Sequence, residues 1–230
     1  MSERAALNRN DIDQEAHSEK PGVQQPVTTI VFDIGRVLIR FEWWEYINKL
    51  MDEETAKAVT DAMWGTGYWH ELDRGVLSTS EIFELFCGAA PEYRDSIRLA
   101  FENVGICTER QDYAIPWIRE MQELGYRVLY LSNYSEHVMS LSSHALDFLP
   151  YMDGGIISCH VRLIKPDPAI YECLCSKYDL KPEECLFIDD NAANIEAARA
   201  FGMHALQFES FDQAHDAVLR YLQDLPGKTR

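Results

Sequence analysis

The sequence predicts an α/β protein with a doubly wound, parallel, Rossmann-like sheet. From residue 113 onwards, short apolar segments alternate with helical segments at close spacing, which is typical of parallel strands joined by right-handed crossovers. A first strand at 27–39 is separated from this series by a long stretch with helical periodicity. We therefore expect a core formed by 27–42 and 113–226, with a helical cap at 43–112 inserted over the strand tips.

Local signals set the expected elements in order. Within the insert, apolar residues recur at three- and four-residue spacing, and Ser78 to Glu81 form an N-cap signal, so no strand is expected between 42 and 112. Gly125 and Gly202 each end an expected helix. We expect strands at 127–131, 155–158, 185–188 and 204–208, and helices at 116–124, 136–146, 168–178, 192–201 and 211–222.

Composition limits the classes of protein. The 230 residues are 47% hydrophobic, which is enough for one full core and a small accessory module. A net charge of −17 argues against nucleic acid and against anionic membranes as partners. No apolar segment approaches the ~20 residues that span a bilayer. Residues 1–26 are polar and lack the apolar segment of a secretory signal, so we expect a disordered tail on a cytoplasmic protein.

The six cysteines are scattered along the chain. Cys173 and Cys175 are two residues apart, with no second pair at zinc-binding spacing. Several of the others lie in apolar segments. The pattern favours buried free thiols in a reducing compartment.

Acidic residues follow two of the expected strands. Asp33 comes directly after the apolar residues 29–32, and Asp189 and Asp190 follow 186–188. Ligands of open α/β sheets bind beyond the carboxyl ends of the strands. A carboxylate there can attack phosphorus to form an aspartyl-phosphate, and Mg²⁺ is needed between the two anions. We expect Asp33 as nucleophile, and Asp33, the carbonyl of Gly35 and one acid of the pair as magnesium ligands.

Donor groups follow the other expected strands. Ser132 and Asn133 come after the apolar residues 128–131. Both types are common in turns, but at a strand tip they favour hydrogen bonds to phosphoryl oxygens. Lys165 lies in the segment Ile-Lys-Pro-Asp-Pro, whose prolines fix the backbone ahead of a helix and so aim the lysine. It would neutralise charge on the phosphoryl group and on Asp33.

The helical insert contributes polar and aromatic residues at 67–71 and 73–75. Trp69 and His70 either pack between the helices or belong to a substrate-specificity loop of a lid, and the sequence leaves both interpretations open. Arg36, three residues after Asp33, is a further candidate for substrate binding.

These segments, in this order, resemble the four motifs of the haloacid dehalogenase-like hydrolase superfamily, over residues 27 to about 222. FDIGRVL resembles the first motif, LSN the second, IKPDPAIY the third and FIDDNAANIEAARAFG the fourth. The insert resembles the helical cap of the subfamily with phosphoglycolate phosphatases, 2-haloacid dehalogenases and the phosphatase domain of soluble epoxide hydrolase. The first motif, F-D-x-G-x-V, is similar to that of a branch that includes a bacterial glucose-1-phosphatase.

The resemblance implies roles for the same residues. It implies Asp33 as nucleophile, Lys165 as stabilising cation, and Ser132 and Asn133 as phosphate donors. In the metal site, it implies that Mg²⁺ binds the second acid of the pair, Asp190, together with the nucleophile and the carbonyl two residues after it. The first acid of the pair, Asp189, is then a close support.

One position departs from the superfamily pattern. Most of its phosphatases carry a second Asp two residues after the nucleophile, which serves as general acid and base, and here Gly35 stands in that place. A good leaving group, such as an anomeric sugar oxygen, needs less protonation. If the leaving group does need a proton, His70 of the cap is the first candidate to supply it.

Three functions are consistent with the sequence. The leading one is a Mg²⁺-dependent phosphatase that hydrolyses a small phosphorylated metabolite, a sugar phosphate, through an aspartyl-phosphate, as a monomer or homodimer. The alternative is a 2-haloacid dehalogenase, which lacks the second acid and needs no metal, although only Arg36 and Arg40 are available for its halide pocket. A weakly active or inactive member that binds a phosphorylated ligand or a protein is the third.

Overall fold

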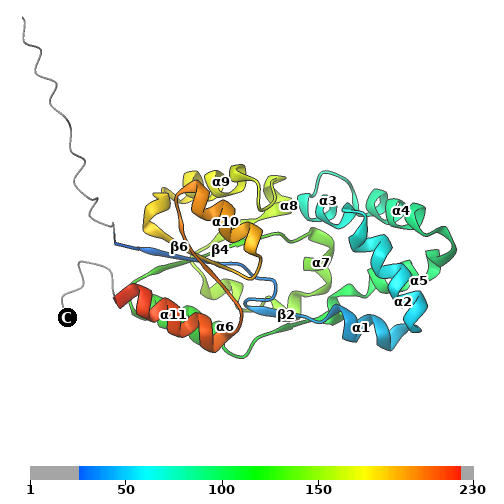
Figure 1. Ribbon diagram of the computed structural model, residues 1–230, viewed down its shortest axis with the longest axis horizontal. Helices are drawn as coiled ribbons and strands as arrows, with labels where there is room; N and C mark the ends of the chain where they lie inside the picture. Colours follow the sequence, from blue (N-terminus) through cyan, green and yellow to red (C-terminus); the bar gives the residue numbers. More distant parts are fainter. Residues whose placement is uncertain (1–25, 224–230) are drawn as a thin grey trace, which may run out of the picture.

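A five-stranded parallel sheet forms the core of the computed structural model, which describes residues 26–223. The expected tail at 1–26 therefore lies outside the described residues, apart from Pro26. The strand order is β5-β4-β1-β6-β7, and Figure 1 labels β4 and β6 of this sheet. The strands are β1 (Thr29–Phe32), β4 (Arg127–Ser132), β5 (Gly155–Ile157), β6 (Cys185–Asp189) and β7 (His204–Gln207). The predicted fold class is confirmed.

Helices cover both faces of the sheet, so the central strand β1 is buried on both sides. Ile30 and Phe32 point into one apolar cluster, and Val31 points into the other, as the two-residue period of a strand requires. The first cluster includes residues of α6 (Ala114–Glu123) and α11 (Phe211–Gln223), and the second includes residues of α9 (Pro168–Tyr178) and α10 (Ala192–Phe201). Both layers pack against the strands of the sheet.

The segment between the first strand and the rest of the core is mostly helical and lies at one end of the molecule (Figure 1). We call residues 43–107 the helical insert. It contains α1 (Trp43–Leu50), α2 (Glu53–Thr60), a π-helical turn (Asp61–Gly65), α3 (Tyr68–Arg74), α4 (Thr79–Ala89), α5 (Arg94–Glu102) and short 3₁₀ turns at Pro91–Tyr93 and Val104–Cys107. Ser78 and Glu81 form the reciprocal capping box that begins α4, as their spacing predicts.

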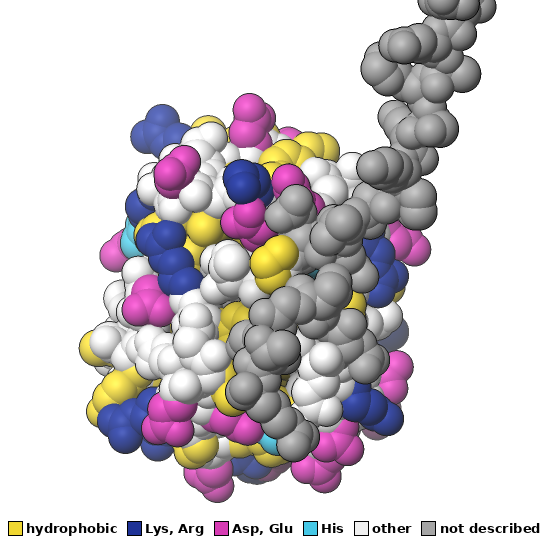
Figure 2. Space-filling view, turned by 90° about the vertical axis from the view of Figure 1, so that its left-hand side faces the viewer, with side chains coloured by type: hydrophobic (Ala, Val, Ile, Leu, Met, Phe, Trp, Pro, Cys, Tyr) yellow, Lys and Arg dark blue, Asp and Glu magenta, His cyan; other side chains and the backbone are white. Residues whose placement is uncertain are grey.

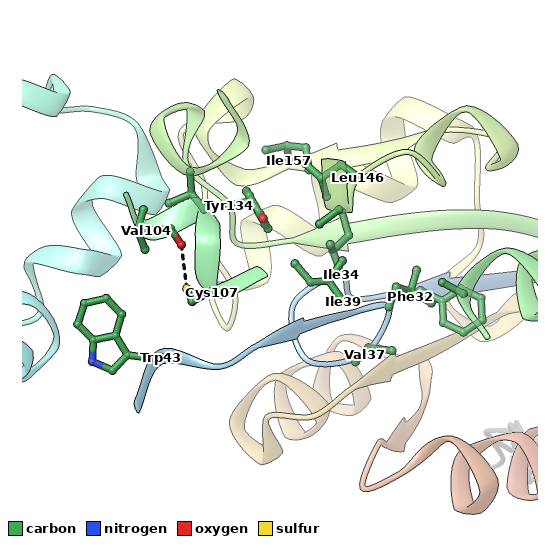
Figure 3. Packing of buried hydrophobic residues seen from close by; sticks show 14 of the residues in the cluster. Phe32, Ile34, Val37, Ile39, Trp43, Val104, Cys107, Tyr134, Leu146 and Ile157 are labelled. Carbon is green, nitrogen blue, oxygen red and sulfur yellow. Dashed lines mark hydrogen bonds between the residues drawn. The ribbon is translucent and has the colours of Figure 1, made fainter. Parts of the chain in front are cut away.

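Two short strands join the insert to the core. β2 (Ile39–Phe41) pairs antiparallel with β3 (Thr108–Arg110). The prediction of no strand between 42 and 112 is therefore wrong at β3, and the expected strand 27–39 is divided into β1 and β2. Because the two paired segments are far apart in the sequence, no local residue pattern predicts this ribbon. Apolar packing continues along this link, from Phe32 through Ile34 and Ile39 towards Trp43 (Figure 3).

Two other elements differ from expectation after β4 and β5. α7 (Glu136–Leu141) is shorter than the expected helix 136–146, because a separate 3₁₀ turn forms at Ser143–Ala145. The strand expected at 155–158 ends at Ile157, and Ser158 begins the short helix α8 (Ser158–Val161). That helix carries the chain towards Lys165.

The surface carries charged side chains of both signs, and the cysteines are free thiols as the sequence predicts. Acidic and basic side chains are interspersed on the end of the core turned away from the insert (Figure 2). All six cysteines lie in the described part of the chain and are free thiols, four of them buried. None of the helices between residues 26 and 223 is long and apolar enough to cross a membrane.

Candidate active site

The predicted site residues come together at the carboxyl edge of the sheet. The tips of β1, β4 and β6 and the segment before α9 border a cavity of about 290 Å³, and residues of the helical insert line its other side. Predicted residues that line it are Asp33, Gly35, Arg36, Trp69, His70, Asn133, Lys165 and Asp190. Ser132 and Asp189 lie behind its wall, with 1% and 0% of their surface exposed.

Asp33 follows the tip of β1, and one of its two carboxylate oxygens is bound by neighbouring groups. Its backbone N–H donates to the Ile188 carbonyl of β6 at 2.8 Å. Its Oδ1 accepts a hydrogen bond from the N–H of Ile34 at 2.7 Å and lies 2.8 Å from Nζ of Lys165. No described residue donates a hydrogen bond to Oδ2, so that oxygen is available for attack. Burial raises the pKa of Asp33 to about 6, although the Lys165 ammonium opposes this shift.

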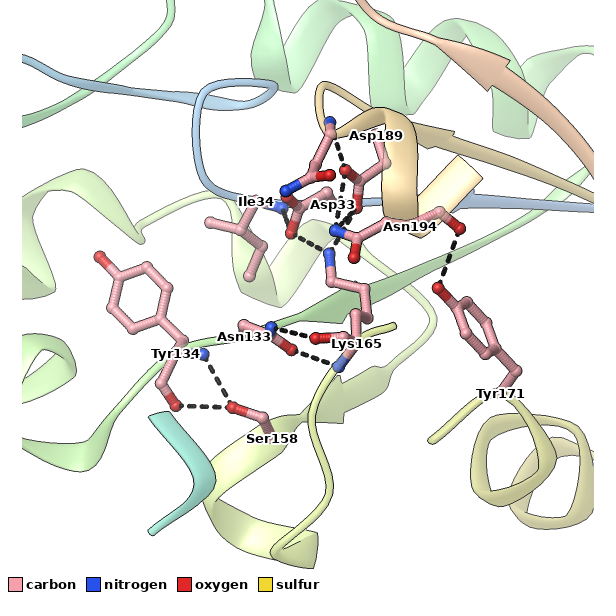
Figure 4. A network of polar contacts seen from close by, with 10 residues as sticks. Asp33, Ile34, Asn133, Tyr134, Ser158, Lys165, Tyr171, Asp189 and Asn194 are labelled. Carbon is pink, nitrogen blue, oxygen red and sulfur yellow. Dashed lines mark hydrogen bonds and ion pairs between the residues drawn. The ribbon is translucent and has the colours of Figure 1, made fainter. Parts of the chain in front are cut away.

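Lys165 lies between two carboxylates (Figure 4). Its Nζ is 2.6 Å from Oδ2 of Asp189 and 2.8 Å from Oδ1 of Asp33, and the side chain is 1% exposed. Burial alone would lower the pKa of Lys165, but the two carboxylates outweigh it and raise the pKa above its ordinary value. The lysine is therefore a fixed cation directed at Asp33.

The two acids after β6 have different surroundings. Both oxygens of Asp189 are occupied, by Lys165, by the N–H of Asn191 and by the side-chain amide of Asn194. Asp190 lines the cavity, and its only ion pair among the described residues is with Arg36 at 3.4 Å. Ligand oxygens of Asp33, Asp189 and Asp190 all lie within 4.8 Å of one another. Asp190 is thus the member of the pair with an oxygen to offer a cation.

Two asparagines stabilise this arrangement. Asn191 is the N-cap of α10, since its side chain accepts from the N–H of Ala193. Asn194 donates its amide to both oxygens of Asp189 at 3.0 and 3.1 Å. The hydroxyl of Tyr171 in turn donates to the Asn194 carbonyl (Figure 4). These contacts fix the acid that holds Lys165.

The polar residues after β4 behave differently from each other. The hydroxyl oxygen of Ser132 is buried and makes no hydrogen bond with the described residues, although it lies close enough to Asp33 to help lower the pKa of that carboxyl. The side chain of Asn133 donates to the Lys165 carbonyl at 2.9 Å and accepts from the Lys165 N–H at 2.8 Å. In this structure, the Asn133 amide fixes the lysine segment. Its expected donation to a phosphoryl oxygen stays a prediction.

The two arginines considered for a halide pocket lie in different places. Arg36 borders the cavity, but its side chain is 72% exposed and pairs with Asp190. Arg40 pairs with Glu109 on the β2–β3 ribbon and is not among the residues that line this cavity. No cluster of arginines therefore surrounds the described cavity.

Aromatic residues of the insert form the wall opposite the carboxylates. Trp69 is buried and stacks on Trp64 at 4.2 Å between ring centroids, and both line the cavity with Phe41. Trp69 thus both packs the insert and borders the site, so the two interpretations of this residue are compatible. His70 borders the cavity as well, but it is exposed to solvent.

Sequence reasoning assigned no role to Asp73, which also lines the cavity. It is 7% exposed, at the end of α3, and burial raises the pKa of its carboxyl to about 8, with a further contribution from Asp33. A local signal was available. Trp69, Leu72 and Asp73 share one face of α3, and an acid on the apolar face of a helix is unusual.

Comparison with known proteins identifies the family. Residues 27–202 match the family model of the haloacid dehalogenase-like hydrolases. Because this match covers most of the chain, the protein belongs to that family and is a hydrolase.

Individual relatives are distant. A sesquiterpene phosphatase of Aspergillus oryzae is 24% identical, over 76% of this chain and 87% of its own. An (S)-2-haloacid dehalogenase of a Pseudomonas species is 24% identical over 45% of each chain. Two other curated relatives are longer proteins, of which this chain spans 37% and 18%.

Solved structures share the fold. A family member from Bacteroides thetaiotaomicron, crystallised with magnesium and inorganic phosphate, superimposes with a TM-score of 0.63 at 17% identity, over 82% of this chain and 98% of the other. At this level of identity the likeness establishes the fold alone.

Proposed function

We propose that the protein is a Mg²⁺-dependent phosphatase that hydrolyses a small phosphorylated metabolite through an aspartyl-phosphate on Asp33. The observation that carries the proposal is the group of three carboxylate oxygens within 4.8 Å beside a buried lysine. Three carboxylates this close repel one another strongly, and one ammonium group compensates only part of that charge. Such a group suits a divalent cation and an anionic substrate.

The residues present fit magnesium. Mg²⁺ prefers carboxylate, carbonyl and water oxygens, and Asp33, the carbonyl of Gly35 and Asp190 would hold it, with Asp189 as close support. Asp33, Gly35 and Asp190 all border the cavity. When bound, the ion supplies the positive charge that lets an anionic phosphate approach a carboxylate.

The protein groups then have separate tasks. Oδ2 of Asp33 attacks phosphorus, while Oδ1 stays fixed by the N–H of Ile34 and by Lys165. Lys165 neutralises charge on the carboxylate and on the incoming phosphoryl group. The unpartnered hydroxyl of Ser132 is the expected donor to a phosphoryl oxygen. Water then releases phosphate from Asp33 and regenerates the carboxylate.

The substrate we propose is a sugar phosphate. The cavity of about 290 Å³ admits a small ligand, and the aromatic wall of Phe41, Trp64 and Trp69 offers apolar faces to a ring opposite the anionic end. The segment 43–112, which contains the helical insert, would act as the cap over a core of 27–42 and 113–226. A cytoplasmic location and a monomeric or homodimeric state belong to the same proposal.

Hydrolysis of p-nitrophenyl phosphate with and without EDTA tests the proposal. We expect activity that is lost on chelation and restored by Mg²⁺. A panel of phosphorylated metabolites, with matched sugar 1-phosphates and 6-phosphates, then tests the substrate class. No hydrolysis of any phosphate ester, with binding retained, would favour the inactive, ligand-binding alternative.

A 2-haloacid dehalogenase is the second candidate. The observation that favours it is Gly35, because the 2-haloacid dehalogenases that the sequence resembles also lack an acid two residues after the nucleophile. The spare carboxylate Asp190 and the absence of an arginine cluster around the described cavity count against it. Chloride release from 2-chloropropionate that persists in EDTA, without phosphatase activity, would establish this candidate.

A further inference from the structure

Asp73 is placed at the cavity by a close contact between the insert and the core. α3 ends at Arg74, and Gly75 follows in the left-handed conformation, with φ of +70°. A Cβ at Gly75 would lie 2.8–2.9 Å from atoms of Cys159 in α8, so only glycine allows this approach. Oγ of Ser158 donates to the Asp73 carbonyl at 2.5 Å. The backbone of Asp73 is thus fixed to α8 of the core.

The carboxyl group of Asp73 has no structural task in this arrangement. It makes no hydrogen bond and no ion pair with any residue between 26 and 223. Nevertheless it is 7% exposed and borders the same cavity as Asp33 and Lys165. A buried acid without a partner is costly, so a chain that keeps one beside its reactive groups points to a function for it.

We propose that Asp73 is the general acid and base of the reaction, in place of the acid that Gly35 does not supply. This inference rests on the phosphatase function proposed above. It assigns a catalytic residue to the insert, whereas the nucleophile and Lys165 belong to the core. The expectation that His70 would supply the proton is replaced, because His70 is exposed to solvent whereas Asp73 is enclosed.

The proton transfers balance over the two steps. In the first, Oδ2 of Asp33 forms a bond to phosphorus, the bond from phosphorus to the leaving oxygen breaks, and the Asp73 proton moves to that oxygen to give a free alcohol. In the second, the Asp73 carboxylate accepts a proton from water as the hydroxide attacks phosphorus. The bond to Asp33 then breaks, inorganic phosphate leaves, and Asp73 is again protonated.

The protonation state of Asp73 suits the first step. Burial is the main cause that raises the pKa of its carboxyl to about 8, the Asp33 carboxylate raises it further, and Lys165 opposes the shift. The acid therefore carries its proton at neutral pH. A proton donor is most effective when its pKa lies near the working pH.

The test compares two esters in wild type and in Asp73→Asn. p-Nitrophenol is an acidic leaving group that departs without a proton, whereas the alkoxide of an alkyl or sugar 6-phosphate needs one. We expect Asp73→Asn to keep kcat/KM for p-nitrophenyl phosphate within about threefold. For the alkyl ester, kcat/KM should fall by ~10²-fold or more. The variant should also show a burst of nitrophenolate, because water attack on the aspartyl-phosphate has lost its base.

Matched controls separate catalysis from structure. Asp61→Asn removes an exposed acid of the insert, outside the cavity, and should leave both esters unaffected. Asp73→Glu keeps a carboxyl group and should recover part of the activity on the alkyl ester. The melting temperature of Asp73→Asn confirms folding, since a neutral amide replaces an acid that burial keeps neutral.

Equal losses on both esters, or an undiminished rate on the alkyl ester, would overturn the assignment. A second test uses wild-type protein alone and compares kcat/KM for a series of phosphate monoesters whose leaving alcohols differ in pKa. Proton donation predicts that kcat/KM depends weakly on the pKa of the leaving alcohol, and a steep dependence would contradict it. A wild-type protein inert toward every ester would instead contradict the phosphatase function itself, and the role of Asp73 with it.

Discussion

Lys165 decides the electrostatics of individual residues at the site. A buried ammonium is tolerated only with partners, and here both are carboxylates from different strand tips. Because Asp189 holds one side of the ammonium and Asn194 holds Asp189, the lysine has little freedom to move. The opposite side faces Asp33, where charge would change during the proposed phosphoryl transfer. Asp189 is therefore the acid that holds the lysine in place, and Asp33 is the acid that we propose reacts.

Substitutions of the acid pair should therefore have different effects. Asp190→Ala removes the acid with a free oxygen and should raise the Mg²⁺ concentration needed for half-maximal activity, with little change in melting temperature. Asp189→Ala leaves Lys165 without one of its two buried partners and should lower the free energy of unfolding by ~3–5 kcal/mol. Metal titrations and thermal melts of both variants check this. Equal metal requirements would show that the ligand is wrongly assigned.

Asp73 gives the stability of the protein a defined pH dependence. Its pKa is about 8 in the folded state, against an ordinary value of 3.8, so folding favours the protonated form. The contribution of protonated Asp73 to the free energy of unfolding is fully present below about pH 4 and is lost as the pH rises through 8. Asp73→Asn does not titrate, and its melting temperature should exceed that of wild type increasingly between about pH 5 and pH 9, by at least ~2–4 °C at the upper end. A constant difference would contradict the raised pKa.

Among the elements, those whose ends depend on local signals were predicted best. α9 and α10 have the expected bounds, because Asp167 with Pro168 begins one helix and Gly202 ends the other. The β2–β3 ribbon was missed because its register joins Ile39 to Arg110, and neither segment carries a pattern of its own. Long-range pairing, and not propensity, creates that element.

The contact between α3 and α8 should control the position of Asp73. Gly75→Ala adds a Cβ at 2.8–2.9 Å from Cys159, at a φ of +70°. We expect this variant to reduce kcat/KM for alkyl esters more than for p-nitrophenyl phosphate, and to lose ~1–3 kcal/mol of stability. Gly67→Ala is the matched control, because its φ is +79° and its Cβ would meet nothing within 4 Å. The same change in ester preference in both variants would refute the docking argument.

The turn after β1 has room for the acid it lacks. A Cβ at Gly35 would meet no atom within 4 Å, and its φ is not in the left-handed region. Gly35→Asp should therefore fold, and in the Asp73→Asn background it should restore activity on alkyl esters by ~10-fold or more. In wild type the same substitution should add little, since the proton is already supplied. Measuring kcat/KM for the four proteins checks both statements, and an equal gain in both backgrounds would contradict them.

At the scale of the whole molecule, the sheet gathers a site from segments far apart in the chain. Asp33, Ser132 and Asp189 could be placed together from sequence because each comes at the end of an apolar segment, and parallel strands end at one edge. The task of Asn133 could not be predicted from sequence. Its side chain fixes the Lys165 segment, and this contact depends on which atoms meet in the folded structure. The position of Asp73 on the apolar face of α3 was a signal that the sequence offered. Its place beside Asp33 and Lys165 could not be predicted, because it arises only when the insert docks on the core.

The covalent intermediate on Asp33 is the central claim of this account. Rapid acid quenching during turnover of p-nitrophenyl phosphate, followed by mass analysis of the peptide that contains residue 33, tests it directly. We predict that wild-type protein gains the mass of one phosphoryl group on Asp33, and that Asp73→Asn accumulates more of it. Asp33→Asn should carry none and should lose at least ~10³-fold of the wild-type rate while it stays folded. Turnover without any phosphorylated Asp33, or more than a tenth of the rate retained in Asp33→Asn, would contradict the mechanism.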